Sequence, residues 1–559
     1  MVDDFDFQQI APRCGGKSEA FEELCCQLAY RSLPAKTVYT RLRGAGGDGG
    51  VECYADLPDG RIGWQAKYVY NIDSLLAQAT ISLTTALSLH DTLTHYILCF
   101  PFDLTGPTAR RGRSGQEKFD EWCKSNIEKA AADGRKLIIE PWSASMLRSL
   151  LLDLDKSGGI RTFFFDHTVL SADWFAAHLS SASATAGPRY TPELNVETNL
   201  WKWFAAFGRT EYWFTTLEKT VSSCLNSCDY LVKAVNRTAS DPLSPAWPED
   251  LREDGQSLVA RIQEILREVN SLSTSDDPGI MRQCIKNISD SIDKLTAMES
   301  RLYEKFEAEH GPGRADSPGF RQFKAEYEVS FPAANLDYIR ETIKVFNDLL
   351  EWLQSPASLL AFERAFVLTG AAGTGKTYGV CDTAHQRFGA GLLSCVVFGH
   401  LFNGRPDPWT RFSESLTLPI TLGMDGLLDA LNAAAEASGS LLIIFLDAIN
   451  ETRPLRYWQE QLAFIQAIQR RPYLRLCVTC RTSFMTYCIP EGSTLPVTEH
   501  MGFSGIEREA CKAFFEFYGL EPPIMPILQP ELSNPLYLKL TCETLKSRRL
   551  NRLPSGSYQ

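Results

Sequence analysis

Apolar and polar residues of the first part of the chain follow a mixed helix and strand pattern. From Phe21 to Leu28 the apolar residues recur at i, i+3, i+4 and i+7, which predicts a helix over 18–29. Two alternating runs flank the turn-forming segment 58–60 and predict a β-hairpin. The other elements expected in this α/β region are a helix over 72–87 and strands over 95–100 and 136–142.

The pattern becomes helical from about residue 195 to 350. Apolar residues from Leu258 to Leu272 and from Met281 to Leu302 mark two long amphipathic helices. Their spacing is close to a heptad, with Glu299 in a core slot, and predicts antiparallel helices packed together. The serine- and alanine-rich segment 180–187 predicts a linker before this region.

Strands and helices alternate from about residue 360, which predicts a parallel sheet with helices on both sides. After residue 505 the pattern is helical again. The expected strands are 365–370, 393–400, 441–448 and 474–481, with helices from Lys376, over 426–435 and over 457–470. We therefore expect an α/β multidomain protein with an α/β domain at 1–170, a helical region at 171–350, a parallel-sheet domain at 351–500 and a helical subdomain at 501–559.

Composition narrows the class of protein. A net charge of −12 argues against a chain that coats nucleic acid along its whole surface, so any DNA contact is expected to be local. The 16 cysteines are scattered, and no secretory signal precedes them. Cys477 and Cys480 lie in an apolar run without a second pair at zinc spacing, so we interpret them as core thiols. The longest purely apolar run, LLIIFL, is too short for a membrane span, and we expect a cytoplasmic location.

A phosphate-binding motif follows the first strand of the parallel sheet. The segment GAAGTGKT matches GxxxxGK[ST] and opens a helix, so Gly370, Gly373 and Gly375 would let backbone N–H groups surround phosphates. Lys376 would reach the outer phosphates, and Thr377 would hold Mg²⁺. The sequence therefore predicts binding of ATP or GTP with Mg²⁺, against the alternative of a structural loop.

Three further residues follow strands of the same predicted sheet. Asp447 ends an apolar strand and is the expected second Mg²⁺ ligand. Glu451 would polarise the attacking water, although a first-turn helix acid is an equal alternative. Arg481 follows the next strand, at the edge where ligands bind, and would sense the γ-phosphate unless it is a surface arginine.

The segments LDAINE, VTCRTS and NPLYLKLTCETL resemble the nucleotide-binding module of STAND NTPases, the NACHT-like signalling ATPases. The resemblance covers roughly residues 360–559 and implies ATP as the nucleotide. It places the asparagine–proline segment in a helical subdomain over the nucleotide, with Pro535 near the adenine. It also implies a winged helix and a repeat-built sensor beyond residue 559, so we expect the chain to be the front part of a longer protein.

The hairpin carries the second set of candidate residues. Because side chains alternate along a strand, Gln65 and Lys67 share one face of the second strand, and Glu52 lies on the corresponding face of the first. An acid, a neutral oxygen ligand and a lysine together predict a metal site that activates water. The alternative is an exposed strand face that carries polar residues for solubility.

The string GDGGVEC…GWQAKY resembles the Mrr-like branch of PD-(D/E)xK nucleases. By this match Glu52 and Gln65 are metal ligands, Lys67 is the catalytic lysine, Glu22 is an accessory acid and metal ligand, and Asp48 lies in the entrance loop. Glutamate stands where aspartate is usual, which leaves the number of metal ions open, and Glu22 has a solvated helix residue as its alternative.

The basic segment ARRGRSGQEK, residues 109–118, follows the strand at 95–100. Its cations Arg110, Arg111, Arg113 and Lys118 would clamp DNA phosphates, with a solvated loop as the alternative. No recognition helix is evident, so little base-specific readout is expected.

Together, an Mrr-like nuclease and a STAND ATPase resemble the antiviral STAND (Avs) proteins of prokaryotic phage defence. The resemblance implies a homo-oligomer, a tetramer, that forms with ATP when a phage protein binds the sensor and that then cuts double-stranded DNA with Mg²⁺. Two alternatives remain: a modification-dependent restriction enzyme with an ATP-driven DNA motor, and a non-catalytic DNA-binding scaffold.

Overall fold

The computed structural model contains two compact units, each assembled from separate stretches of the chain. The first unit comprises Met1–Tyr190, Val380–Leu476 and Thr486–Glu491, and the second comprises Thr191–Gly379, Cys477–Met485 and Gly492–Gln559. The structure describes residues 6–35, 37–42, 49–106, 113–236, 247–275, 277–310, 333–404, 407–418, 422–490, 492–523 and 530–553.

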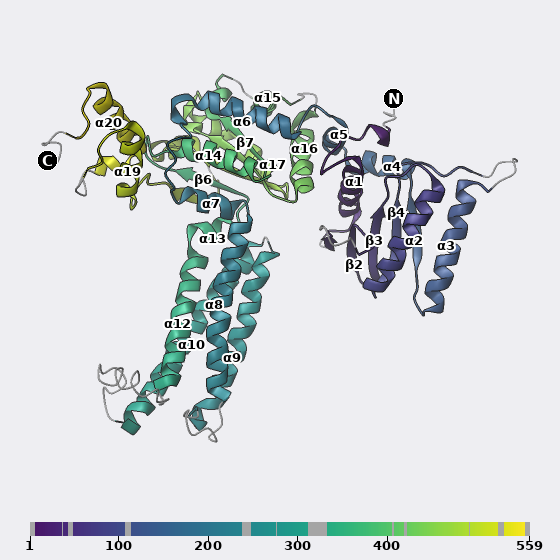
Figure 1. Ribbon diagram of the computed structural model, residues 1–559, viewed down its shortest axis with the longest axis horizontal. Coiled ribbons are helices and arrows are strands. Elements are labelled where there is room, and N and C mark those ends of the chain that lie inside the picture. The colour runs from purple at the N-terminus through teal and green to yellow at the C-terminus, as the bar shows by residue number, and fades with distance from the viewer. Residues whose placement is uncertain are drawn as a thin grey trace. The chain divides into compact units, whose positions relative to one another are not determined.

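The first unit begins with a mixed five-stranded sheet in the order β1-β2-β3-β4-β5 (Figure 1). The first three strands pair antiparallel, and β3, β4 and β5 pair parallel. Residues 58 and 59 form the turn between β2 and β3, which confirms the predicted hairpin. The strands are β1 (Val38–Arg41), β2 (Cys53–Leu57), β3 (Gly60–Ala66), β4 (Leu93–Cys99) and β5 (Ile138–Trp142).

Helices cover both faces of this sheet. Helix α1 (Lys17–Ser32) packs against β3 and confirms the first predicted helix. Helices α2 (Ile72–Leu89) and α3 (Gly115–Ala132) form a core with Tyr96 and Leu98 of β4. Because both faces are covered, the central strand β3 ends in four buried residues rather than in a simple alternation.

Helix α2 is long and apolar enough, by length and composition, to cross a membrane, with a mean hydropathy of 1.2. Only 22% of its residues are buried inside the structure. Its buried residues Leu75, Ala79, Leu83 and Ala86 recur along one face of the helix and pack into the core of the sheet. The helix therefore has a packing role in the N-terminal domain.

The expected linker at 180–187 is wrong, because this segment belongs largely to helix α6 (Ala172–Ala186). The serine and alanine residues are compatible with a helix whose small side chains allow close packing. Phe175 and Leu179 are buried, and α6 packs against strand β7 (Ser394–Phe398). Helices α4 (Ala144–Leu154) and α5 (Gly159–Phe165) precede it.

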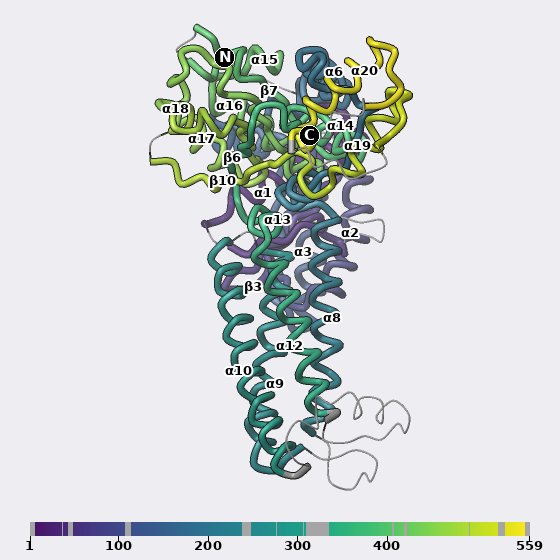
Figure 2. Tube along the Cα trace, turned by 90° about the vertical axis from the view of Figure 1, so that its left-hand side faces the viewer, coloured from purple at the N-terminus to yellow at the C-terminus, as the bar shows by residue number. Residues whose placement is uncertain are grey.

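Long helices make up much of the second unit and lie side by side in two perpendicular views (Figures 1 and 2). They bury an apolar core, as the helical spacing predicted. Met298 and Leu302 occupy the core, whereas Glu299 lies at its rim and pairs with Arg340 at 2.8 Å, so the core slot predicted for Glu299 is wrong. The helices are α7 (Leu200–Phe207), α8 (Glu211–Asn236), α9 (Glu249–Asn270), α10 (Pro278–His310), α12 (Ala333–Gln354) and α13 (Pro356–Leu360).

The C-terminal sheet has five parallel strands in the order β10-β6-β9-β8-β7. The predicted strands are present, and Cys477 and Cys480 are fully buried as core thiols. Strand β10 was not predicted, because a three-residue edge strand carries too little pattern. The strands besides β7 are β6 (Ala365–Thr369), β8 (Leu442–Asp447), β9 (Leu474–Thr479) and β10 (Val497–Glu499).

The helices of this region follow the predicted alternation with one difference. The expected helix over 457–470 is divided into a 3₁₀ segment, Leu455–Glu460, and α17 (Leu462–Gln469). The remaining helices are α14 (Lys376–Gly389), α15 (Pro408–Ser415), α16 (Gly423–Ser438), α18 (Met485–Cys488), α19 (Glu507–Tyr518) and α20 (Pro535–Ser547). The chain is thus an α/β multidomain protein with a mixed sheet, a helical middle region and a parallel sheet.

Candidate functional site

The loop between β6 and α14 has the backbone that its glycines predict. Gly370, Gly373 and Gly375 have φ values of 157°, 79° and 92°, a region that residues with a side chain rarely adopt. At Gly370 an added Cβ would lie 2.5 Å from the carbonyl oxygen of His500. The glycines are therefore required for both the conformation and the close packing of this loop.

Lys376 begins α14 and folds back into the loop. Its Nζ donates hydrogen bonds to the carbonyl oxygens of Gly370 and Ala371 at 2.8 and 2.9 Å, and it lies 3.3 Å from Thr374 Oγ1. The lysine is buried, and Thr377 beside it is half-buried. A single buried ammonium group thus lies at the N-terminus of a helix, where the helix dipole also favours anions.

The N-terminus of α20 packs directly on this loop. Asn534 Nδ2 donates to the carbonyl oxygen of Ala372 at 2.8 Å, and Leu536 N donates to that of Gly373 at 3.1 Å. The ring of Pro535 lies 3.5 Å from the position of a Cβ on Gly375. Pro535 is therefore at the phosphate-binding loop, and its predicted contact with adenine stays a prediction.

Asn534 and His500 are two residues of this site to which sequence reasoning assigned no role. Asn534 Oδ1 caps α20 by accepting from Leu536 N and Tyr537 N, and an asparagine before proline is a sequence signal for such a cap. His500 follows the unpredicted strand β10 and is buried, and its pKa is lowered to about 4 by burial and by the nearby Lys376. It is therefore neutral at pH 7 and adds no charge to the loop.

Asp447 and Glu451 lie in the first unit. Asp447 ends β8 and is fully buried, opposite Phe398 of β7. Glu451 ends a 3₁₀ turn, Ile449–Glu451, and both of its carboxylate oxygens accept from Arg189 Nη1 at 3.2 Å. Glu451 thus lies in a three-residue 3₁₀ turn, and its action on water stays a prediction.

Arg481 follows β9 in the second unit, as the strand prediction required. It is exposed and precedes the 3₁₀ turn Thr482–Phe484. The loop beside it is held by Thr482 N, which donates to the carbonyl oxygen of Gly370 at 3.2 Å. Arg481 therefore directly precedes a residue bonded to the phosphate-binding loop, and its role as a γ-phosphate sensor stays a prediction.

The hairpin brings its acid and its glutamine together. Gln65 Nε2 lies 2.5 Å from Glu52 Oε1, and Glu52 N donates to the carbonyl oxygen of Trp64 at 2.8 Å. Gln65 is fully buried and pairs with Leu98 of β4, so its side chain faces the α2 side of the sheet. Gln65 is thus buried on the central strand β3, whereas Glu52 is half-buried just before β2. The buried amide differs from the exposed, solubilising strand face that was the alternative prediction.

The other predicted nuclease residues lie on different elements of the N-terminal domain or outside the described residues. Lys67 directly follows β3 and is half-buried, with its backbone N donating to the carbonyl oxygen of Cys99 at 2.9 Å. Glu22 lies on α1 and accepts from Ser18 Oγ at 3.4 Å. Asp48 lies outside the described residues. In the described part of the chain, no three His, Cys, Asp or Glu side chains form a group that could hold a metal ion.

The basic segment has only two of its cations among the described residues. Arg113 forms an ion pair with Glu121, and Lys118 pairs with Asp73 at 2.8 Å. Arg110 and Arg111 lie outside the part that the structure describes. The two placed cations have acidic partners on the protein, and Lys118 lies in helix α3 rather than in a loop. Their contact with DNA stays a prediction.

No protein-family model matches the chain, and a search of curated proteins finds no significant match.

Proposed function

We propose that the chain binds a nucleoside triphosphate, ATP, with Mg²⁺ at the loop formed by residues 370–377. The observation that carries this proposal is the glycine-rich turn with the buried Lys376 ammonium inside it. The backbone amides and Lys376 would hold the phosphates, and Thr377 is the proposed Mg²⁺ ligand beside them. Bound Mg²⁺ would neutralise phosphate charge. Asp447, Glu451 and Arg481 stay sequence predictions for the same chemistry.

Nucleotide binding is tested by thermal unfolding with and without Mg·ATP. Because a ligand that binds only the folded state stabilises it by RT ln(1 + [L]/Kd), about 2.7 kcal/mol at 100 times the Kd, the wild type should gain several degrees in Tm. Lys376→Ala should lose this gain, and Lys512→Ala, on the exposed face of α19, should keep it. An equal gain in wild type and Lys376→Ala would contradict the proposal.

For the N-terminal domain we propose Mg²⁺-dependent cleavage of double-stranded DNA. It is supported by the contact between the half-buried Glu52 and the buried Gln65, with Lys67 two positions beyond Gln65. The carboxylate and the amide oxygen would bind the metal, and Lys67 would orient the attacking water. In the wider proposal, an ATP-bound homo-oligomer, a tetramer, activates this domain in defence against phage after a phage protein is sensed.

Plasmid nicking tests the nuclease proposal. Lys67→Ala should abolish Mg²⁺-dependent nicking while the fold and ATP binding remain. Lys156→Ala is the matched control, because this lysine is 77% exposed and pairs with Asp153, three positions before it. Full cleavage by purified Lys67→Ala would remove the lysine from the proposed chemistry.

A non-catalytic DNA-binding domain is the second candidate. It is favoured by the absence, among the residues that the structure describes, of three clustered acidic, histidine or cysteine ligands. The two candidates differ in one result: wild-type protein that retards plasmid in a gel but never nicks it, in Mg²⁺ or Mn²⁺ and at high protein concentration, would support the scaffold.

A further inference from the structure

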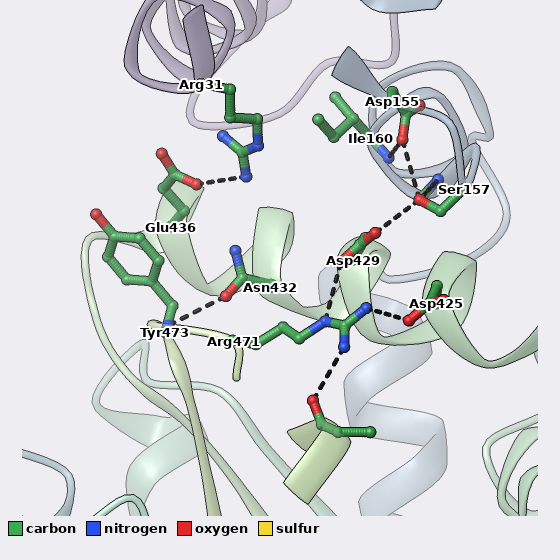
Figure 3. Close-up of polar contacts among 12 residues, drawn as sticks. Arg31, Asp155, Ser157, Ile160, Asp425, Asp429, Asn432, Glu436, Arg471 and Tyr473 are labelled. Carbon is green, nitrogen blue, oxygen red and sulfur yellow. Dashed lines mark hydrogen bonds and ion pairs between the residues drawn. The ribbon is translucent and has the colours of Figure 1, made fainter. Parts of the chain in front are cut away.

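Helix α16 of the P-loop region has the N-terminal domain packed along one face (Figure 3). Small residues recur on this face at positions 426, 430, 433 and 437. Gln27 Nε2 of α1 donates to the carbonyl oxygen of Ala433 at 3.1 Å, and Cys14 Sγ lies 3.6 Å from that of Ala437. The contact therefore runs along most of the helix.

Two glycines allow the backbones to approach at one end of this contact. An added Cβ at Gly159, the first residue of α5, would lie 2.5 Å from the carbonyl oxygen of Gly426 and 2.6 Å from Ala430 N. A Cβ at Gly426 would lie 2.7 Å from the carbonyl oxygen of Ser157. These neighbours are backbone atoms, so no side-chain rotation would relieve the overlap.

An ion pair between Arg31 and Glu436 lies at the other end of the contact, near the C-terminus of α16. Arg31 Nη2 of α1 lies 2.9 Å from Glu436 Oε2 of α16, and the side chains are 22% and 5% exposed. Burial raises the pKa of the Glu436 carboxyl, and Arg31 opposes this rise. Removing one member of such a pair leaves a buried charge without its partner, which is more costly than losing a surface pair.

Hydrogen bonds extend from this contact to the start of strand β9 (Figure 3). Ser157 Oγ donates to Asp429 Oδ2 at 2.7 Å, and Arg471 Nε donates to Asp429 Oδ1 at 3.0 Å. Tyr473 N, directly before β9, donates to Asn432 Oδ1 at 3.1 Å. Helix α16 is thus bonded on one side to the N-terminal domain and on the other to the segment that enters the parallel sheet.

Helices α1 and α16 are also each connected to a strand that carries a candidate site residue. Helix α1 packs against β3, which carries Gln65, and α16 leads directly into β8, which ends at Asp447. Arg31 follows Glu22 by nine positions, which places them about 180° apart around α1 at ~100° per residue. The contact therefore holds α1 from the side opposite Glu22 and does not cover that residue.

We propose that α16 is a docking surface for the N-terminal domain, held by the Gly159–Gly426 crossing and the Arg31–Glu436 pair, and that it transmits changes at β8 and β9 to helix α1. The docking itself is independent of any activity. The transmission rests on the proposed nucleotide function.

Hydrogen exchange of the full chain tests the docking. Arg31→Glu and Glu436→Arg should each speed amide exchange in α5 and α16 by about tenfold, because local opening exposes their backbones. The double variant Arg31→Glu/Glu436→Arg restores opposite charges and should recover most of the protection. Arg261→Glu is the control, since Arg261 pairs with Glu264 on the exposed surface of α9. Unchanged exchange in both single variants, or no recovery in the double variant, would overturn the docking surface.

A glycine pair provides a test that does not change charge. Gly159→Ala should also speed exchange in α16, because its Cβ has no space beside Gly426. Gly389→Ala, at the end of α14 where nothing lies within 4 Å of the added Cβ, should leave exchange as in the wild type. Protection of α16 in Gly159→Ala equal to that in the wild type would overturn the glycine crossing.

Transmission is tested by adding Mg·ATP. In the wild type, exchange in α1 should change by about threefold or more, and this change should be absent in Arg31→Glu. An equal response of α1 in both proteins would overturn the transmission. If residues 370–377 themselves gain no protection, the nucleotide proposal and the transmission both fail, and the docking is then judged on the charge and glycine variants alone.

Discussion

Arg189 holds the carboxylate of Glu451. Arg189 Nη1 donates to both Glu451 oxygens at 3.2 Å, and His400 Nδ1 lies 3.8 Å from one of them. Arg189 ends the short 3₁₀ turn Gly187–Arg189 that follows α6, far from Glu451 in sequence. A residue predicted to act on water is thus paired with an arginine from outside the parallel-sheet domain that the sequence predicted.

We expect Arg189→Ala to raise basal ATP hydrolysis several-fold, because Glu451 would be released to orient toward water. Steady-state phosphate release measures the rate. Arg411→Ala is the control, since Arg411 forms an ion pair of similar exposure with Glu414 in the same unit. The rise should be lost in Arg189→Ala/Glu451→Gln. A rate in Arg189→Ala equal to that of the wild type would contradict a restraining role.

The sequence predicted the elements that carry a long or distinctive pattern. The phosphate-binding loop was predictable because Gly370, Gly373 and Gly375 are required for its backbone. Buried strands such as β8 were predictable from continuous apolar runs. The segment 180–187 was misassigned because its serine and alanine content is shared by linkers and by tightly packed helices, and only the packing of α6 on β7 distinguishes them.

Contacts between distant parts of the chain could not be predicted. His500 joins the phosphate-binding loop through β10, which is too short to recognise from pattern. The pairing of Arg31 with Glu436 and the hold of Arg189 on Glu451 depend on tertiary packing alone. The Glu52–Gln65 contact was predictable because the hairpin turn sets the register between neighbouring strands.

The cap of α20 also connects it to the phosphate-binding loop. Asn534→Ala would remove the side-chain bonds to Leu536 N and Tyr537 N and the bond to the carbonyl oxygen of Ala372. We expect a loss of about 1 kcal/mol in stability and a several-fold weaker affinity for Mg·ATP, measured by calorimetry. Thr541→Ala, within the same helix, is the control. An unchanged Kd in Asn534→Ala would show that α20 does not contribute to binding.

The half-buried His178 and the buried His500 predict a loss of stability in mild acid. Burial lowers the pKa of His178 from its ordinary value of 6.5 to about 4, and His178 Nε2 accepts from Val396 N at 3.0 Å. The pKa of His500 is also lowered to about 4, by burial and by Lys376. Between pH 4 and 6.5 the unfolded chain binds more protons at these histidines than the folded chain does. Each neutral histidine therefore contributes to the free energy of unfolding above pH 6.5, and this contribution, up to about 3 kcal/mol per histidine, is lost as the pH falls toward 4.

Thermal unfolding between pH 7.5 and 4.5 measures this loss. His178→Gln keeps an acceptor that does not titrate, so we expect its Tm to fall less steeply with acid than that of the wild type. His167→Gln, at an exposed position, should leave the slope unchanged. A wild-type slope retained in His178→Gln would assign the acid sensitivity to other groups.

The Glu52–Gln65 pair permits a test of metal binding without any cleavage assay. Gln65→Glu places a second carboxylate, at a buried position, about 2.5 Å from the half-buried Glu52 Oε1. Without metal the two like charges should cost about 2 kcal/mol or more. A divalent cation should offset this repulsion, so Mg²⁺ should raise the Tm of Gln65→Glu by several degrees more than that of the wild type.

Gln27→Glu is the matched control for this experiment. Gln27 is also fully buried, and its Nε2 donates to Glu23 Oε1 at 2.8 Å, so the substitution creates a comparable pair of carboxylates in the same domain. Glu23 already pairs with Arg41 and lies outside the proposed site. We therefore expect Gln27→Glu to be destabilised but not rescued by Mg²⁺. Equal rescue of both variants would indicate a nonspecific effect of the ion, and no rescue of Gln65→Glu would remove the pair from the proposed metal site.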